Sequence, residues 1–148
     1  MNIGFTGSQF GMSDTQQQTL LTLLGALISG NDFAHVSTFH HGDSTGADRQ
    51  AHYLVERFGL IPIVIHPSRS KRYYSLRECC PGCDAVIKPR LPYLKRNQAI
   101  VDECDMLIAT PEYDAKEDCF DHFDLNFGVW SLASMAWEKN KPLMFLKR

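Results

Sequence analysis

The chain has 148 residues and a formal net charge of −2, from 17 acidic and 15 basic side chains. This length is typical of one domain, so we expect a single domain over residues 1–148. The content of 44 % hydrophobic and 22 % charged residues excludes a disordered or fibrous chain. A net charge so close to zero argues against a simple basic module that binds nucleic acid.

The first half of the chain alternates apolar runs with helical patterns. Residues 3–6 form a short apolar run, and leucines at helical spacing over 20–28 predict a helix that Ser13 or Asp14 caps. A second strand is expected at 36–40. A second apolar helical stripe covers 47–58 and stops at Gly59, and residues 60–65 predict a third strand.

The second half continues the alternation, interrupted by two long segments. We expect a helix at about 94–104, a strand at 106–109, a helix at about 129–139 and a last strand at 143–146. Short apolar strands that alternate with helices indicate an α/β fold: a Rossmann-like, open, mainly parallel sheet of five strands with helices on both faces. The segments at about 67–92 and 111–127 are predicted to be long loops, which are usually functional or flexible.

Ligands of such sheets bind beyond the carboxyl ends of the strands. Small and polar residues gather there, at Thr6-Gly7-Ser8, at 40–48, at His66 and at Pro111-Glu112. In the turn 42–48, glycines allow close approach of the backbone to a ligand, and the following helix start can hold a phosphate. Turn formation and helix capping by Ser44 and Thr45 explain part of this composition equally well.

The histidines and cysteines are weaker candidates. A metal cluster of His41, Asp43 and His66 is an alternative that we do not favour, and His52 is predicted to be exposed. Cys80 and Cys83 form a CxxC pair beside Cys79, but one pair supplies only part of a zinc site, which His66 or Cys119 would have to complete. Since the count of five cysteines is odd and the N-terminus does not read as a signal peptide, we expect free thiols. We expect neither a bound metal nor a cofactor.

Several motifs follow one another along the chain: Thr6-Gly7-Ser8, the turn His41-Gly42-Asp43-Ser44-Thr45-Gly46-Ala47-Asp48, and Arg96-Asn97 followed by Ile100-Val101-Asp102 and Asp105-Met106-Leu107-Ile108-Ala109. Together they resemble the SLOG superfamily. The superfamily unites DprA-type DNA-processing proteins, LOG-type nucleotide hydrolases and small stand-alone domains, and the spacing is nearest to the small bacterial and phage branch. The resemblance covers about residues 2–146 and implies a Rossmann-like fold that binds a nucleotide or a nucleotide derivative.

The resemblance also implies roles for individual residues. Arg96 would make a bidentate contact with a phosphate or carboxylate, and Asn97 would fix the surrounding loops. LOG-type hydrolases carry a PGGxGTxxE stretch before the last helix, whereas this chain has Phe127-Gly128-Val129-Trp130-Ser131 and no glutamate in 132–136. Gly128 and the helix start still suit a phosphate.

The small net charge hides two strongly charged segments. Residues 67–96 contain eight basic and two acidic residues, and residues 102–126 contain nine acidic residues and one basic residue. A basic lip at the ligand edge would attract phosphates. The acidic segment is interpreted as a solvated loop, with a metal or a partner as alternatives.

We therefore expect the protein to bind a nucleotide-like small molecule, as a sensor, carrier or sequestering protein. The alternatives are a nucleotide N-glycosidase or related hydrolase with Asp43 or Glu112 as acid/base, and a single-stranded nucleic-acid binder. A cytoplasmic homodimer without a membrane segment is expected. The predicted ligand-binding residues are Thr6, Gly7, Ser8, His41, Gly42, Asp43, Ser44, Gly46, Ala47, Asp48, His66, Arg96, Asn97, Pro111 and Gly128.

Overall fold

A computed structural model describes residues 1–29, 36–69, 84–112 and 128–148. In chain order, its elements are β1 (Asn2–Gly7), α1 (Asp14–Ser29), β2 (Thr38–His41), α2 (Ala47–Phe58), β3 (Ile63–Ile65), β4 (Ala85–Ile87), α4 (Tyr93–Glu103), β5 (Met106–Thr110), α5 (Gly128–Glu138) and β6 (Leu143–Phe145). Within these ranges, no helix combines the length and the apolar character that a membrane span requires.

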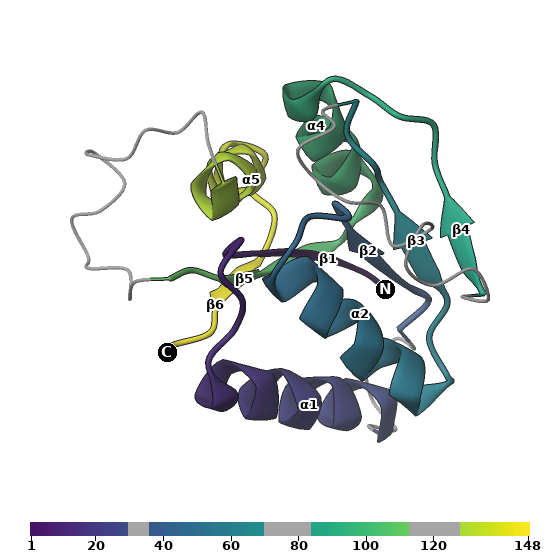
Figure 1. The fold of residues 1–148 in the computed structure, drawn as a ribbon, viewed down its shortest axis with the longest axis vertical. Helices are drawn as coiled ribbons and strands as arrows, with labels where there is room; N and C mark the ends of the chain where they lie inside the picture. The colour runs from purple at the N-terminus through teal and green to yellow at the C-terminus, as the bar shows by residue number, and fades with distance from the viewer. Residues whose placement is uncertain (30–35, 70–83, 113–127) are drawn as a thin grey trace.

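The strands form one open sheet in the order β4-β3-β2-β1-β5-β6, and every pair is parallel. Along the chain, the strands run outward from β1 to β4, and the next strand, β5, then pairs with the other side of β1 (Figure 1). The predicted Rossmann-like α/β fold with a parallel sheet is therefore confirmed. The change of direction at β1 is where folds of this type open a crevice for ligands.

The predicted number of five strands is wrong, because β4 makes a sixth. This strand lies inside the segment 67–92, which we expected to be a loop, and a bridge between Ser68 and Leu91 lies in the same segment. β4 is only three residues long and lies at the edge of the sheet, with Val86 and Ile87 exposed. Its apolar run, Ala85-Val86-Ile87, is short and lies in a segment rich in charged residues and prolines, which we interpreted as a loop.

Two pairs of helices cover the sheet. α1 and α2 pack against each other on one face, and α4 and α5 pack against each other on the opposite face (Figure 1). Ile3 and Phe5 of β1 belong to the core under α1 and α2. Leu107 of β5 belongs to the smaller core on the other side, together with Ile100 and Leu132. Since side chains alternate between the faces of a strand, the central strands contribute to both cores.

A buried glutamine joins the start of α1 to the ends of two strands. Ser13 caps the helix: its Oγ accepts a hydrogen bond from the Gln16 amide at 3.1 Å, and the Gln16 Oε1 accepts one from the Ser13 amide at 3.0 Å. This reciprocal pair is a capping box. The Gln16 Nε2 donates to the carbonyl oxygens of Pro111 at 2.9 Å and Leu146 at 3.0 Å. Gln16 thereby fixes the chain just after β5 and β6.

Replacing Gln16 by alanine is expected to lower the free energy of unfolding by about 2–3 kcal/mol, because it leaves buried polar groups without partners. The matched control is Gln18→Ala on the exposed side of the same helix, where the change should stay within about 0.5 kcal/mol. Urea denaturation of both variants measures the difference. Equal stability of the two variants would contradict the role given to Gln16.

Candidate ligand pocket

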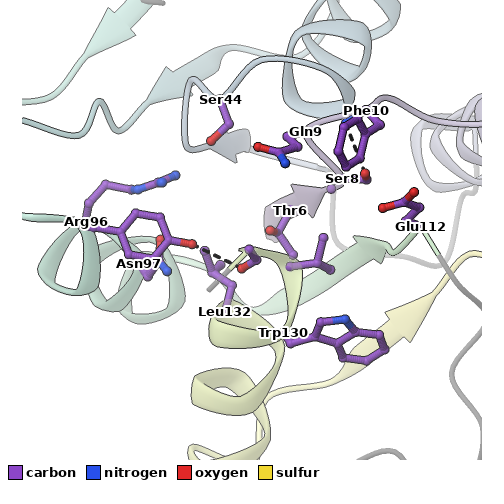
Figure 2. A pocket seen from close by; sticks show the side chains of 14 residues that line it. Thr6, Ser8, Gln9, Phe10, Ser44, Arg96, Asn97, Glu112, Trp130 and Leu132 are labelled. Carbon is purple, nitrogen blue, oxygen red and sulfur yellow. Dashed lines mark hydrogen bonds between the residues drawn. The ribbon is translucent and has the colours of Figure 1, made fainter. Parts of the chain in front are cut away.

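A cavity of about 360 Å³ lies at the carboxyl ends of β1 and β5. Arg96 and Asn97 of α4 lie on one side and Glu112 on the other, and Trp130 of α5 lies below (Figure 2). Cavities that hold small organic ligands have volumes of about 300–1,000 Å³. The lining consists of Thr6, Gly7, Ser8, Gln9, Phe10, Ser44, Tyr93, Arg96, Asn97, Glu112, Gly128, Val129, Trp130 and Leu132.

Backbone hydrogen bonds around Ser8 fix the floor of this pocket. The Ser8 amide donates to the Thr110 carbonyl at 3.1 Å, which ties the end of β1 to the end of β5. The Ser8 carbonyl accepts from the amides of Ala47 at 2.9 Å and Gly11 at 3.0 Å, and its Oγ accepts from the Phe10 amide at 3.1 Å. The turn after β1 is therefore held rigidly against the start of α2.

Arg96 places a buried positive charge at the pocket. Its side chain lies in the first turn of α4, is only 2 % exposed, and stacks on the ring of Tyr93 with Cζ 5.0 Å from the ring centroid. Among the described residues Arg96 forms no ion pair, and its Nε has no hydrogen-bond partner. A buried guanidinium without an ion-pair contact is costly, so the site is suited to bind an anion.

The guanidinium of Arg96 occupies space that a glycine leaves open. A Cβ atom at Gly42 would overlap with Nη1 of Arg96 and come within 2.6 Å of Cζ. Residue 42 must therefore be glycine if Arg96 is to keep this position. The turn after β2 and the start of α4 are therefore packed closely together at Gly42 and Arg96.

Asp48 stabilises the same turn through hydrogen bonds to its backbone. Its Oδ2 accepts hydrogen bonds from the amides of Gly42 at 3.0 Å and Ser44 at 3.2 Å. Burial raises the pKa of Asp48 to about 6, although the charge of Arg96 and these two amides act in the opposite direction. The carboxyl group thus shapes the turn, and its charge partly balances that of Arg96.

Two further polar groups are buried without partners beside the pocket. Asn97 donates from Nδ2 to the Ser131 Oγ at 3.1 Å, which joins α4 to α5. In the described part of the chain, however, the Asn97 Oδ1 and the Thr110 Oγ1 have no hydrogen-bond partner. Together with the Arg96 Nε, they leave donor and acceptor capacity that a polar ligand could use.

Aromatic side chains form another part of the lining. Phe10 is 73 % exposed, an unusual position for a phenylalanine, and Trp130 of α5 is half-buried. Tyr93 donates a hydrogen bond to the Gly128 carbonyl at 3.3 Å (Figure 2). The predicted site residues did not include Gln9, Phe10, Tyr93, Val129, Trp130 or Leu132. Phe10, two residues after Thr6-Gly7-Ser8, is an aromatic residue at a strand end and was a signal that the sequence offered.

The structure places the predicted residues in three groups. Seven predicted ligand-binding residues line the cavity, as does Glu112: Thr6, Gly7, Ser8, Ser44, Arg96, Asn97 and Gly128. Four lie directly behind the lining, beside Arg96, residues 8 and 9, or the turn at 42–44: Gly42, Gly46, Ala47 and Asp48. The remaining four are not among the lining residues: His41, Asp43, His66 and Pro111.

The expectation that His52 is exposed is wrong. His52 is fully buried, and its Nδ1 lies 3.0 Å from the Nε2 of His41. The His41 Nδ1 accepts a hydrogen bond from the Asp43 amide, so its Nε2 carries the proton and donates to His52. His52 lies outside the apolar stripe of α2 but can be buried, because His41 of β2 provides a hydrogen-bond partner.

The alternative metal cluster of His41, Asp43 and His66 does not form. His41 packs against His52 of α2, whereas the His66 Nε2 lies 2.9 Å from the Nδ1 of His40. The two neighbouring histidines of β2 therefore point to opposite faces of the sheet and join separate pairs. In the part of the chain that the structure describes, the one group with metal-ligand spacing is His40, His66 and Glu103.

Some predictions concern residues outside the described ranges. These residues are Cys79, Cys80, Cys83 and Cys119, the basic residues Lys71, Arg72 and Arg77, and most of the acidic segment. The zinc alternative, the full basic lip and the loop at 111–127 therefore stay predictions.

Two sequence comparisons with known proteins gave no match. No protein-family model matches the sequence, and a search of curated proteins found no significant match. The function is therefore argued from the pocket itself.

The buried histidines predict acid sensitivity. Burial lowers the pKa values of His40, His41, His52 and His66, to about 4 for His66. The unfolded chain then binds more protons than the native protein between about pH 4 and 6.5, so stability rises with pH in this range. Asp48, with a pKa of about 6, acts in the opposite direction but is a single group.

In metal-free buffer, the free energy of unfolding is expected to fall by about 1–2 kcal/mol from pH 6.5 to pH 5.5. Urea denaturation at a series of pH values measures this change. A stability that is constant or increases on acidification over this interval would contradict the assignment of neutral buried histidines.

Proposed function

We propose that this protein binds a nucleotide or a nucleotide-derived small molecule in the pocket at the carboxyl edge of the sheet, as a sensor, carrier or sequestering protein. The observation that carries the proposal is the buried guanidinium of Arg96, which lies beside the cavity without a carboxylate in ion-pair contact among the described residues. We also propose, from the motifs quoted above, that the chain is a member of the SLOG superfamily.

A phosphate fits the polar end of the pocket. Arg96 supplies charged donors, and α5 begins at Gly128, which lines the pocket together with Val129. The first amides of a helix have no partners within the helix and suit a phosphate. The hydroxyl groups of Thr6 and Ser8 add short polar contacts. This combination of a cation, a helix start and hydroxyl groups is suited to an anion with several acceptor oxygens.

An aromatic base fits the other part of the lining. Trp130 and Phe10 offer flat apolar surfaces for stacking, and Gln9 offers an amide for hydrogen bonds to a base edge. A nucleotide has both a phosphate and a base, so it matches the pocket better than inorganic phosphate or a purely apolar ligand. The volume of about 360 Å³ is sufficient for one mononucleotide-sized ligand.

Native mass spectrometry of the purified protein, with a panel of nucleoside monophosphates, diphosphates, cyclic nucleotides and ADP-ribose derivatives, tests the proposal. We expect one ligand to remain bound and inorganic phosphate to compete with it weakly. Failure of every nucleotide in the panel to bind, at concentrations up to the millimolar range, would overturn the proposal.

Nucleotide hydrolysis is the second candidate function, and the position of Glu112 in the pocket lining favours it. Its carboxyl-bearing side chain lines the pocket on the side opposite Arg96 (Figure 2), whereas Asp43 is not a lining residue. A carboxylate beside a bound N-glycosidic or phosphate ester bond can act as general acid or base. Chromatography of the nucleotides after incubation with the protein detects released base or sugar phosphate. Quantitative recovery of intact nucleotide would exclude hydrolysis of the tested compounds.

A further inference from the structure

A second cluster of polar side chains lies apart from the pocket. His40 lies on β2, His66 directly follows β3, and Glu103 is the last residue of α4. Their ligand atoms all lie within 4.8 Å of one another. The two histidines are buried and the Glu103 side chain is 38 % exposed, so the cluster is open to solvent on one side. None of the three lines the nucleotide pocket.

The histidines present ring nitrogens toward each other. The His40 Nδ1 lies 2.9 Å from the His66 Nε2 and 3.9 Å from the Glu103 Oε2. The other nitrogen of His40, Nε2, lies 2.7 Å from the Thr38 Oγ1. When this Nε2–H donates to Thr38, the lone pair of Nδ1 faces the cluster. Histidines that bind metals typically have such a partner for their second nitrogen.

We propose that His40, His66 and Glu103 bind a divalent transition-metal ion of the Zn²⁺ type. Tetrahedral Zn²⁺ with bonds of about 2.0–2.2 Å holds its ligand atoms roughly 3.4 Å apart. The distances of 2.9 and 3.9 Å lie on either side of this value, and all three ligand atoms lie within 4.8 Å of one another. Two imidazoles and one carboxylate favour such an ion over Mg²⁺ or Ca²⁺, which prefer oxygen ligands. A water molecule reaching the open side would complete the coordination.

Lys88 competes with the metal for Glu103. Its Nζ lies 2.8 Å from the Glu103 Oε2, and its side chain is 37 % exposed, so the ammonium group can turn into solvent when an ion arrives. If the cluster binds a metal, removing Lys88 strengthens binding and removing the charge of Glu103 weakens it. If the cluster is only structural, neither substitution affects metal binding.

The test is a Zn²⁺ titration of the full chain in competition with a chromophoric chelator. It uses a background in which Cys79, Cys80 and Cys83 are replaced by serine, because their thiols are also typical zinc ligands. We expect one ion per chain, and Mg²⁺ should not compete.

Substitutions in this background assign the site. Affinity should fall by about 10-fold or more for Glu103→Gln and further for His66→Gln, and by about 10–100-fold for Thr38→Val. Affinity should rise by about threefold to fivefold for Lys88→Gln. Glu103 and Lys88 are partly exposed, so these two variants give an answer even if a histidine variant fails to fold. Absent binding, or shifts in the same direction for Glu103→Gln and Lys88→Gln, would overturn the proposal.

Discussion

Replacing Arg96 by methionine is expected to weaken nucleotide binding by at least about a hundredfold, since two charge-assisted hydrogen bonds contribute about 3 kcal/mol or more. Methionine fills much of the same volume and keeps an apolar contact with Tyr93. The variant should therefore fold, and it no longer buries an unpaired guanidinium. Calorimetric titration with the nucleotide found in the panel measures the loss.

The adjacent residue provides the matched control. Lys95 carries the same charge on the same helix but is exposed and does not line the pocket. Lys95→Met should reduce affinity by less than about threefold, because water and salt screen the interaction of an exposed charge with the ligand. If the two variants lose affinity equally, only the overall positive charge matters and the specific role of Arg96 is wrong.

Replacing Gly46 by alanine is expected to lower the free energy of unfolding by about 3–5 kcal/mol. Gly46 precedes α2 with φ of 78° and ψ of −120°, a conformation that side chains rarely adopt. A Cβ at this position would also overlap with the backbone carbonyl of Gln9. Since the added Cβ would be fixed to the backbone of residue 46 and the overlapping atoms belong to the backbone of Gln9, neither can move aside easily.

Gly25→Ala is the control for this prediction. Gly25 lies inside α1, and a Cβ there would have nothing within 4 Å. Alanine should therefore raise stability by about 0.5–1 kcal/mol through its better helix propensity. Thermal and urea denaturation of both variants measure the contrast. A Gly46→Ala variant as stable as the native protein would show that the turn between β2 and α2 adapts freely.

The fold was predictable where burial imposes a pattern. β1 and β5 are covered by helices on both faces and are continuous apolar runs, and α2 buries one apolar face, so the bounds of all three agree with the expectation within a few residues. β4 was missed because Val86 and Ile87 are exposed at the sheet edge. The periodicity of a sequence reports buried faces, and short edge strands lack them.

The candidate site was predictable in its location but not in its contacts. Small polar residues at strand ends indicated the edge of the sheet at which the cavity lies, and Arg96 and Gly128 line this cavity. The fit between Gly42 and Arg96 joins residues far apart in sequence, so no local pattern reveals it. The predicted exposure of His52 was wrong for a related reason, because its hydrogen-bond partner, His41, lies on another element.

A crystal structure of the protein with the nucleotide selected from the panel tests the central claim most directly. We predict the phosphate within hydrogen-bond distance of the Arg96 guanidinium and the base beside Trp130 or Phe10. A nucleotide bound at another surface, with the Arg96 guanidinium still lacking an anion, would contradict the account.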